Sequence, residues 1–118
     1  MIVASEVYLG AAPYYARHQI PYSDDLFRSL VRLCRLDTSS CALDLGAGTG
    51  LISIPLTRSV ANVLSVDPSD EMLKEARRLA DASGVENIEF LVSRSEDVNR
   101  PTSSFDIATI AGAFLWMD

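Results

Sequence analysis

The chain has 118 residues, of which 48% are hydrophobic and 22% are charged, so its composition predicts one folded globular domain and excludes a disordered chain. The net charge of −6 comes with no Lys/Arg cluster longer than Arg77-Arg78, so the sequence predicts no nucleic-acid partner. No stretch approaches the ~20 apolar residues of a membrane span. No export signal is recognisable either, so we expect no membrane partner and a cytoplasmic location.

In chain order, the expected elements are an arm (1–22), a helix (23–36), a strand (41–45), a helix (51–61), a strand (62–67), a helix (70–83), a strand (88–92), a loop (93–104) and a strand (105–111). Pro55 is expected to bend or shorten the second helix. Strands that are almost continuously apolar and alternate with helices indicate a parallel sheet. The fold class is therefore α/β, a Rossmann-like parallel sheet with flanking helices.

The two cysteines lie in apolar surroundings along the sequence. Cys34 belongs to the apolar pattern of the first helix, and Cys41 begins an apolar run. Both are expected to be small buried hydrophobic residues rather than a disulfide or a ligand pair. This favours a reducing compartment, and no metal site is predicted.

Three glycines stand at every second position where the first strand gives way to the second helix. Gly46, Gly48 and Gly50 allow a tight turn and the approach of a ligand to the backbone. The dinucleotide fingerprint would require Gly or Ala at position 51, which is Leu51 here. A nicotinamide or flavin oxidoreductase is therefore disfavoured.

Two carboxylates are expected at the carboxyl ends of adjacent strands, where open α/β sheets bind ligands. Asp44 would add negative charge beside a pyrophosphate and suits a ligand with an ammonium group. Asp67 ends the second strand, 21 residues after Gly46, where an acid can accept hydrogen bonds from ribose hydroxyls. The alternative is that both acids only cap loops.

Four segments in order, ALDLGAGTG, VLSVDPSDEMLKEAR, SRSEDV and FDIATIAGAFLWMD, resemble the class I S-adenosylmethionine-dependent methyltransferases. The resemblance extends over about residues 14 to 118, including YYARHQIPYSDDL, and is strongest to the small-molecule group labelled methyltransferase type 11. It implies methyl transfer from S-adenosylmethionine to a small-molecule acceptor. The cofactor supplies the leaving group, so no nucleophilic residue is required and the catalytic residues are unknown.

The resemblance also implies a set of cofactor-binding residues. The methionine and ribose would lie along Gly46, Ala47, Gly48 and Thr49, with the ammonium near Asp44 and the ribose hydroxyls on Asp67. The adenine would pack against Pro68 and Met72, and its edge would meet Ser95, Glu96 and Asp97. The cofactor would be covered by Tyr15 and Arg17, and its methyl group would lie beside Ala111 and Gly112. Alternatives are that Met72 is ordinary helix core, that Glu96 and Asp97 form a solvated acidic loop, and that Arg17 is a plain surface residue.

The chain departs from the family in two ways. Leu115 stands where many relatives have a histidine, so a mechanism that uses this histidine is in doubt here. The complete family fold has further strands, so we expect residues 23–118 to be a partial cofactor-binding domain, inactive by itself. The alternative is a non-enzymatic fragment or interaction module. The open edge of the fourth strand would then favour a homodimer, by edge pairing or exchange of elements.

Overall fold

The computed structural model describes residues 23–101, 104–110 and 113–116, and the side chains of 113–116 are not among the described ones. The described elements are α3 (Asp24–Cys34), β1 (Cys41–Leu45), α4 (Ser53–Leu56), β2 (Asn62–Asp67), α5 (Asp70–Ala82), β3 (Ile88–Val92), the 3₁₀-helix η1 (Ser95–Asp97), β4 (Ile107–Ile110) and β5 (Ala113–Trp116). The predicted arm, residues 1–22, lies outside them.

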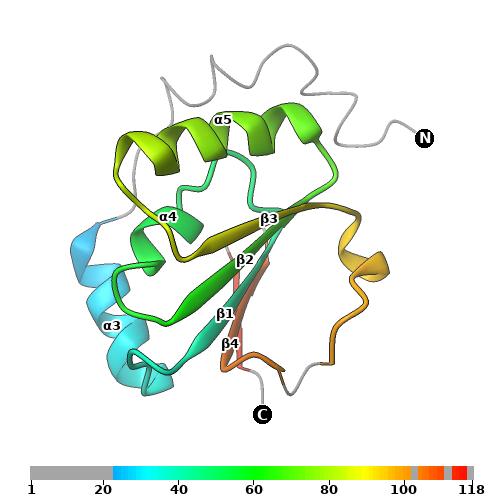
Figure 1. Ribbon diagram of the computed structural model, residues 1–118. Coiled ribbons are helices and arrows are strands. Elements are labelled where there is room, and N and C mark those ends of the chain that lie inside the picture. The colour runs from blue at the N-terminus through cyan, green and yellow to red at the C-terminus, as the bar shows by residue number, and fades with distance from the viewer. Residues whose placement is uncertain (1–22, 102–103, 111–112, 117–118) are drawn as a thin grey trace.

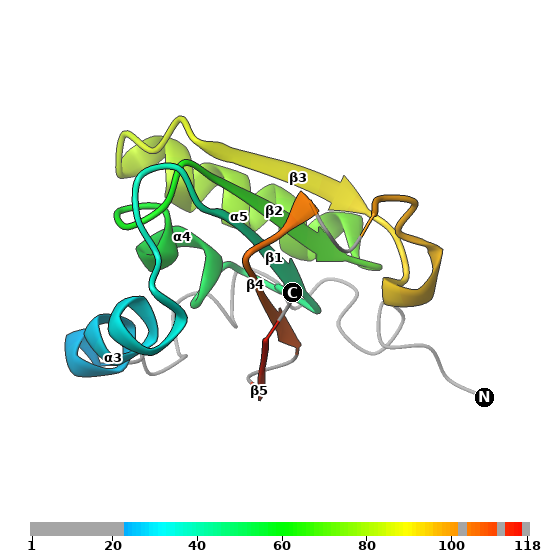
Figure 2. The same ribbon diagram turned by 90° about the horizontal axis from the view of Figure 1, so that it is seen from below.

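The strands form one sheet in the order β3-β2-β1-β4-β5, with α3, α4 and α5 beside it (Figure 1). Strands β1 to β4 are parallel, and the register places Asp44 beside Ser65 of β2 and Thr109 of β4. The connections through α4 and α5 step in one direction across the sheet, so right-handed crossovers place both helices on the same face. Figure 2 shows this arrangement from a second side. The predicted parallel α/β fold is confirmed.

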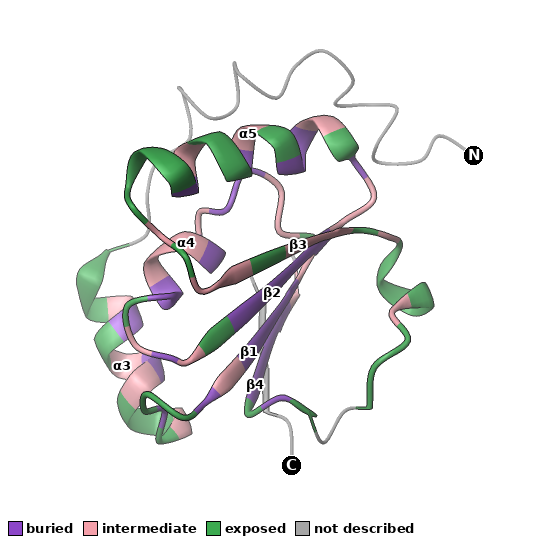
Figure 3. Cartoon of the chain, viewed as in Figure 1, coloured by how far each residue is buried: buried purple, intermediate pink, exposed green. Residues whose placement is uncertain are grey.

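Successive side chains of each strand point to opposite faces of the sheet, so the core is divided between the two faces. On the helix face, Ala42, Val63 and Ile107 pack with Leu56 of α4 and Phe27 of α3. The opposite face carries a second cluster of buried residues: Leu43, Leu64, Val66, Phe105 and Ala108. Both faces of the central strands are therefore covered, and β1 and β2 are mostly purple in Figure 3.

Helices α3 and α5 begin as the sequence predicts. Ser23 and Ser69 are their N-caps, with hydroxyls that accept hydrogen bonds from the N–H groups of Leu26 and Met72. Gly84, at φ +71°, follows the end of α5. In the described part of the chain, none of the helices is both long and apolar enough to cross a lipid bilayer.

The predicted helix 51–61 is wrong in length, because α4 has only four residues. Pro55 lacks the N–H group that would donate to the carbonyl of Leu51 in a helix that began there, and proline is tolerated only in the first turn, where α4 has it. After α4 the chain forms a tighter turn of the 3₁₀ type, since the N–H of Arg58 donates to the carbonyl of Pro55, three residues earlier. The side-chain amide of Asn87 donates hydrogen bonds to the carbonyls of Thr57 (2.8 Å) and Val60 (3.1 Å). In a continuing helix, backbone N–H groups would have donated to these carbonyls.

The edge of the fourth strand, which the sequence predicts to be open, is paired in the structure. β5 pairs antiparallel with β4, with Ala113 opposite Ile110, so β4 lies inside the sheet. Only two residues separate these strands, a spacing that allows antiparallel pairing without a crossover. The expected homodimer through a free edge of β4 therefore loses its basis.

Candidate functional site

The turn between β1 and α4 lies at the carboxyl edge of the parallel strands and contains the three glycines. Gly46, Gly48 and Gly50 have φ values of +69°, +57° and +90°, a region that residues with a Cβ rarely adopt. A Cβ on Gly50 would lie 2.9 Å from Cδ1 of Ile54, whereas a Cβ on Gly48 would meet nothing within 4 Å. A side chain at Gly50 would therefore force Ile54 to shift, while Gly48 faces open space where a ligand can approach the backbone.

Two backbone hydrogen bonds hold this turn against the end of β2. The N–H of Ala47 donates to the carbonyl of Val66 (2.9 Å), and the N–H of Gly48 donates to Oδ2 of Asp67 (2.9 Å). The glycine turn and Asp67 are thus in direct contact at this edge of the sheet.

Asp67 is half-buried, and backbone groups fix the orientation of its carboxylate. Its Oδ1 accepts a hydrogen bond from the N–H of Ser69 (2.8 Å), while Oδ2 accepts the one from Gly48. Each carboxylate oxygen can accept more than one hydrogen bond, so acceptor capacity remains on both. A carboxylate held in this way suits a pair of neighbouring hydroxyls such as those of a ribose.

Asp44 lies in a very different environment, because its side chain is only 2% exposed. Its Oδ2 accepts a hydrogen bond from the hydroxyl of Ser53 (2.6 Å), and its Oδ1 accepts one from Thr109 (2.6 Å). The Ser53 hydroxyl lies 2.7 Å from that of Ser65. Burial raises the pKa of Asp44, and the hydrogen bonds oppose this increase. The contact with an ammonium group stays a prediction, and this carboxylate faces hydroxyls of the protein.

The other predicted cofactor residues divide by position. Thr49 and Met72 are buried, at 3% and 5% exposed, and Pro68 is half-buried. Burial of Met72 on α5 also fits its alternative role as helix core. Three further predicted residues form the exposed η1, just beyond β3: Ser95, Glu96 and Asp97. The remaining three lie outside the described residues: Tyr15, Arg17 and Ala111.

Glu96 and Asp97 already have a common partner. Nε of Arg94 lies 3.3 Å from a carboxylate oxygen of Glu96 and 2.9 Å from one of Asp97. Their roles at the adenine edge stay predictions, and the pairing with Arg94 also fits the alternative of a solvated acidic loop.

Sequence reasoning missed the hydroxyl residues around Asp44: Ser53 and Thr109 donate to its carboxylate, and Ser65 contacts Ser53. Ser65 and Thr109 are fully buried polar residues within otherwise apolar strand segments, VLSV and IATI. A polar residue in such a run signals a buried hydrogen-bond partner, because an unpaired hydroxyl is unfavourable there. The signal was present in the sequence, but the partner depends on strand register.

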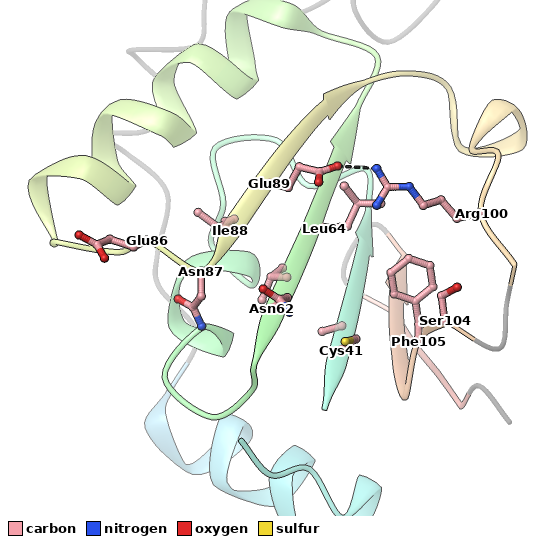
Figure 4. Close-up of a pocket in the computed structure, with 12 residues that line it drawn as sticks. Cys41, Asn62, Leu64, Glu86, Asn87, Ile88, Glu89, Arg100, Ser104 and Phe105 are labelled. Carbon is pink, nitrogen blue, oxygen red and sulfur yellow. Dashed lines mark hydrogen bonds and ion pairs between the residues drawn. The ribbon is translucent and has the colours of Figure 1, made fainter. Parts of the chain in front are cut away.

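A pocket of about 440 Å³ lies at the opposite edge of the sheet (Figure 4). Its lining includes the first residues of three strands, Cys41, Asn62 and Ile88, and the ion pair between Arg100 and Glu89. None of its lining residues belongs to the predicted cofactor site, so it does not contribute to the assembly around the glycine turn.

A comparison with protein families supports the resemblance noted in the sequence. The family model described as a methyltransferase domain matches residues 42–118, well over half of the chain. The chain belongs to this methyltransferase family. Membership implies the use of S-adenosylmethionine in methyl transfer, and the matched region includes Asp44, the glycine turn and Asp67.

Individual relatives agree with this assignment. The uncharacterized methyltransferase YcgJ of Bacillus subtilis is 37% identical over 67 residues, which are 57% of this chain and 26% of YcgJ. Its crystal structure gives a TM-score of 0.68 at 28% identity, over 77% of this methyltransferase chain and 39% of the other. The chain thus spans well under half of the length of YcgJ.

The expectation that a nucleic-acid partner is excluded is wrong. The human tRNA (uracil-5-)-methyltransferase homolog A is 33% identical over 78 residues, 66% of this chain and 12% of that protein. An RNA methyltransferase from Salinibacter ruber, solved in complex with S-adenosyl-L-homocysteine, shares the fold with a TM-score of 0.65 at 22% identity, over 77% of this chain and 60% of the other. Net charge sums over the whole chain and does not describe any one surface, so it cannot exclude RNA.

Proposed function

We propose that this methyltransferase chain binds S-adenosylmethionine on the turn 46–50, with the Asp67 carboxylate on the ribose hydroxyls. The single observation that carries the proposal is the geometry of Asp67. Its carboxylate is held by the N–H groups of Gly48 and Ser69 at 2.9 and 2.8 Å, at the end of β2 and beside a turn whose Gly48 faces open space. The hydroxyls of a ribose therefore meet an acceptor whose orientation is already fixed.

The residues around this acceptor fit the rest of the cofactor. The turn at Gly46–Gly48 allows close approach to the backbone, and η1 follows β3 at the same edge of the sheet. We assign Pro68 and Met72 to the adenine side, as the family resemblance implies. When bound, S-adenosylmethionine supplies a methyl group on a sulfonium, and the chain's part is to bind and orient it.

For the methyl acceptor, we propose a small molecule, on the basis of the resemblance to the small-molecule group of the family. RNA is the competing acceptor, because it is favoured by the similarity to the human tRNA methyltransferase homolog. A transfer assay with radiolabelled cofactor should therefore include a pool of small metabolites and a pool of structured RNA. Cofactor binding without transfer to either pool would favour the alternative of a non-enzymatic binding module.

Calorimetric titration with S-adenosyl-L-homocysteine tests the cofactor site directly. Asp67→Ala removes the proposed ribose acceptor and should reduce affinity at least about tenfold, since a hydrogen bond to a charged group contributes roughly 1.5–3 kcal/mol. Asp37→Ala is a matched control, because Oδ1 of Asp37 accepts from the N–H of Ser39 at 2.8 Å as Asp67 accepts from Ser69. Asp37 precedes β1 and therefore lies at the opposite edge of the sheet.

The two variants separate a specific site from a general loss of structure. Asp37→Ala should leave the affinity unchanged while losing a similar local hydrogen bond. A folded wild-type chain that does not bind S-adenosyl-L-homocysteine, or equal affinities for wild type and Asp67→Ala, would overturn the assignment of this site.

A further inference from the structure

We propose that Asp44 is a positioning residue, whose buried carboxylate clamps both ends of the glycine turn to the sheet through Ser53, Ser65 and Thr109. In this role Asp44 does not contact the cofactor. It sets the shape of the turn that the proposed function uses, so its expected effect on cofactor affinity rests on that function.

The four side chains form one connected group across three strands and a helix. Asp44 is on β1, and the register places Ser65 of β2 and Thr109 of β4 directly beside it. Ser53 is the first residue of α4 and contacts Asp44 and Ser65, at 2.6 and 2.7 Å. All four are at most 2% exposed, so the group is shielded from water.

The hydrogen bonds form a directed chain. Ser65 can donate to Ser53, Ser53 donates to one oxygen of Asp44, and Thr109 donates to the other. Within the described residues, none of the buried side-chain polar atoms lacks a hydrogen-bond partner. A network in which each member is satisfied is rigid, whereas loss of one donor leaves a buried acceptor unpaired.

Helix α4 gives a second reason for the role of Asp44. The N-cap position of α4 is Ile52, which makes no side-chain capping bond. Asp44 instead accepts a hydrogen bond from the hydroxyl of Ser53, the first residue of α4, and the backbone of Ser53 also acts to lower the pKa of Asp44. An acid nine residues earlier in the chain thus holds the first residue of α4, where the local sequence supplies no capping side chain.

This geometry closes the turn at both ends. The turn leaves β1 after Leu45, next to Asp44, and returns to Asp44 at Ser53. Between these points, Ala47 and Gly48 are held by Val66 and by Asp67. Thr109 ties the same carboxylate to β4, so the position of the turn depends on three strands at once.

The test compares two buried threonines in the full chain. Thr109→Val removes the hydroxyl that donates to Asp44, whereas Thr57→Val removes one that donates to the carbonyl of Ile54 and does not touch Asp44. Amide hydrogen exchange by NMR on 15N-labelled protein reports the opening of the turn at Gly48 and Gly50. Titration with S-adenosyl-L-homocysteine on the same samples reports affinity.

With Thr109→Val we expect exchange at Gly48 and Gly50 to become about tenfold faster and affinity to fall by a similar factor. Thr57→Val should change neither quantity, and Thr109→Ser, which restores the hydroxyl, should recover both. Asp44→Asn should give the same faster exchange as Thr109→Val. These results would support the clamp.

Two outcomes would overturn the clamp. One is unchanged exchange at the glycines in both Thr109→Val and Asp44→Asn. The other is a loss of affinity in Asp44→Asn with unchanged exchange, which would make Asp44 a direct contact of the ligand. If the wild-type chain does not bind S-adenosyl-L-homocysteine, the proposed function fails, and the exchange rates still decide whether the clamp exists.

Discussion

Replacement of Gly50 by alanine should destabilise the protein more than the same change at Gly84. Both glycines have positive φ, +90° and +71°, so in each case alanine incurs backbone strain of about 1–2 kcal/mol. The added Cβ meets nothing within 4 Å at Gly84. At Gly50 it lies 2.9 Å from Cδ1 and 3.0 Å from Cγ1 of Ile54, with Cβ of Ala76 at 3.6 Å.

The crowding at Gly50 is the basis of the larger effect. Rotation about χ2 can move Cδ1 of Ile54 away, but Cγ1 is placed by χ1, which has little freedom because Ile54 is branched at Cβ and lies in α4. Overpacking of this kind costs about 1–3 kcal/mol. Alanine also restricts the unfolded chain, which offsets about 0.4–1 kcal/mol at each site. We therefore expect losses of about 1 kcal/mol for Gly84→Ala and about 2–4 kcal/mol for Gly50→Ala.

Urea unfolding followed by circular dichroism measures both free energies of unfolding. Gly48→Ala is a further control, since its φ is +57° and its Cβ would face open space, and it should lose about as much as Gly84→Ala. Losses for Gly50→Ala and Gly84→Ala that agree within about 0.5 kcal/mol would refute the packing argument. The turn would then tolerate a side chain where the structure shows contact with Ile54.

Leu56→Ala should lower the free energy of unfolding by about 2–5 kcal/mol, because Leu56 is 0% exposed, whereas Leu33→Ala, at a residue 63% exposed, should change it by less than about 0.5 kcal/mol. Asn87→Ala should lower it by about 1–3 kcal/mol, since two carbonyls lose their partner; urea unfolding measures all three. Because the pKa of Asp44 is raised by folding, the folded state binds this proton more tightly than the unfolded chain does, so stability is lost as pH rises from about 4 through the folded-state pKa. Asp44→Asn lacks this loss, and the stability of the variant minus that of the wild type should therefore increase between pH 4 and pH 7. A difference that stays constant over this range would contradict the assignment.

The strand framework could be predicted from the sequence because local signals agree there. The bounds of β1, β2 and β3 match the predicted ranges 41–45, 62–67 and 88–92. Each is a short apolar run next to residues that favour turns, so burial and turn chemistry define the same ends. Helix α5 likewise has an N-cap, an apolar stripe and a terminal glycine that agree.

The elements that differ from prediction depend on contacts from distant residues. The end of α4 involves the amide of Asn87, which is 30 residues away from Thr57 in the chain. The predicted fourth strand, 105–111, begins at Ile107 in the structure, and the preceding Asp106 contacts Cys41 of β1 twice: its N–H donates to the Cys41 carbonyl (2.7 Å), and its carboxylate accepts from the Cys41 N–H (2.8 Å). Local patterns cannot specify such partners.

The contrast between the two acids follows from strand geometry. Asp44 is level with Ser65 on β2, and Asp67 lies two residues beyond Ser65, so both acids point to the helix face. Two residues of strand advance the chain by about 6.6 Å. This distance carries Asp67 to the end of β2, next to the turn, while Asp44 remains beneath α4. Two carboxylates on one face are therefore separated into a buried acceptor of protein hydroxyls and a half-buried acceptor available to a ligand. A one-residue change in the register of β2 would move Asp67 to the opposite face and remove its contact with Gly48, so the site depends on the pairing of β1 with β2.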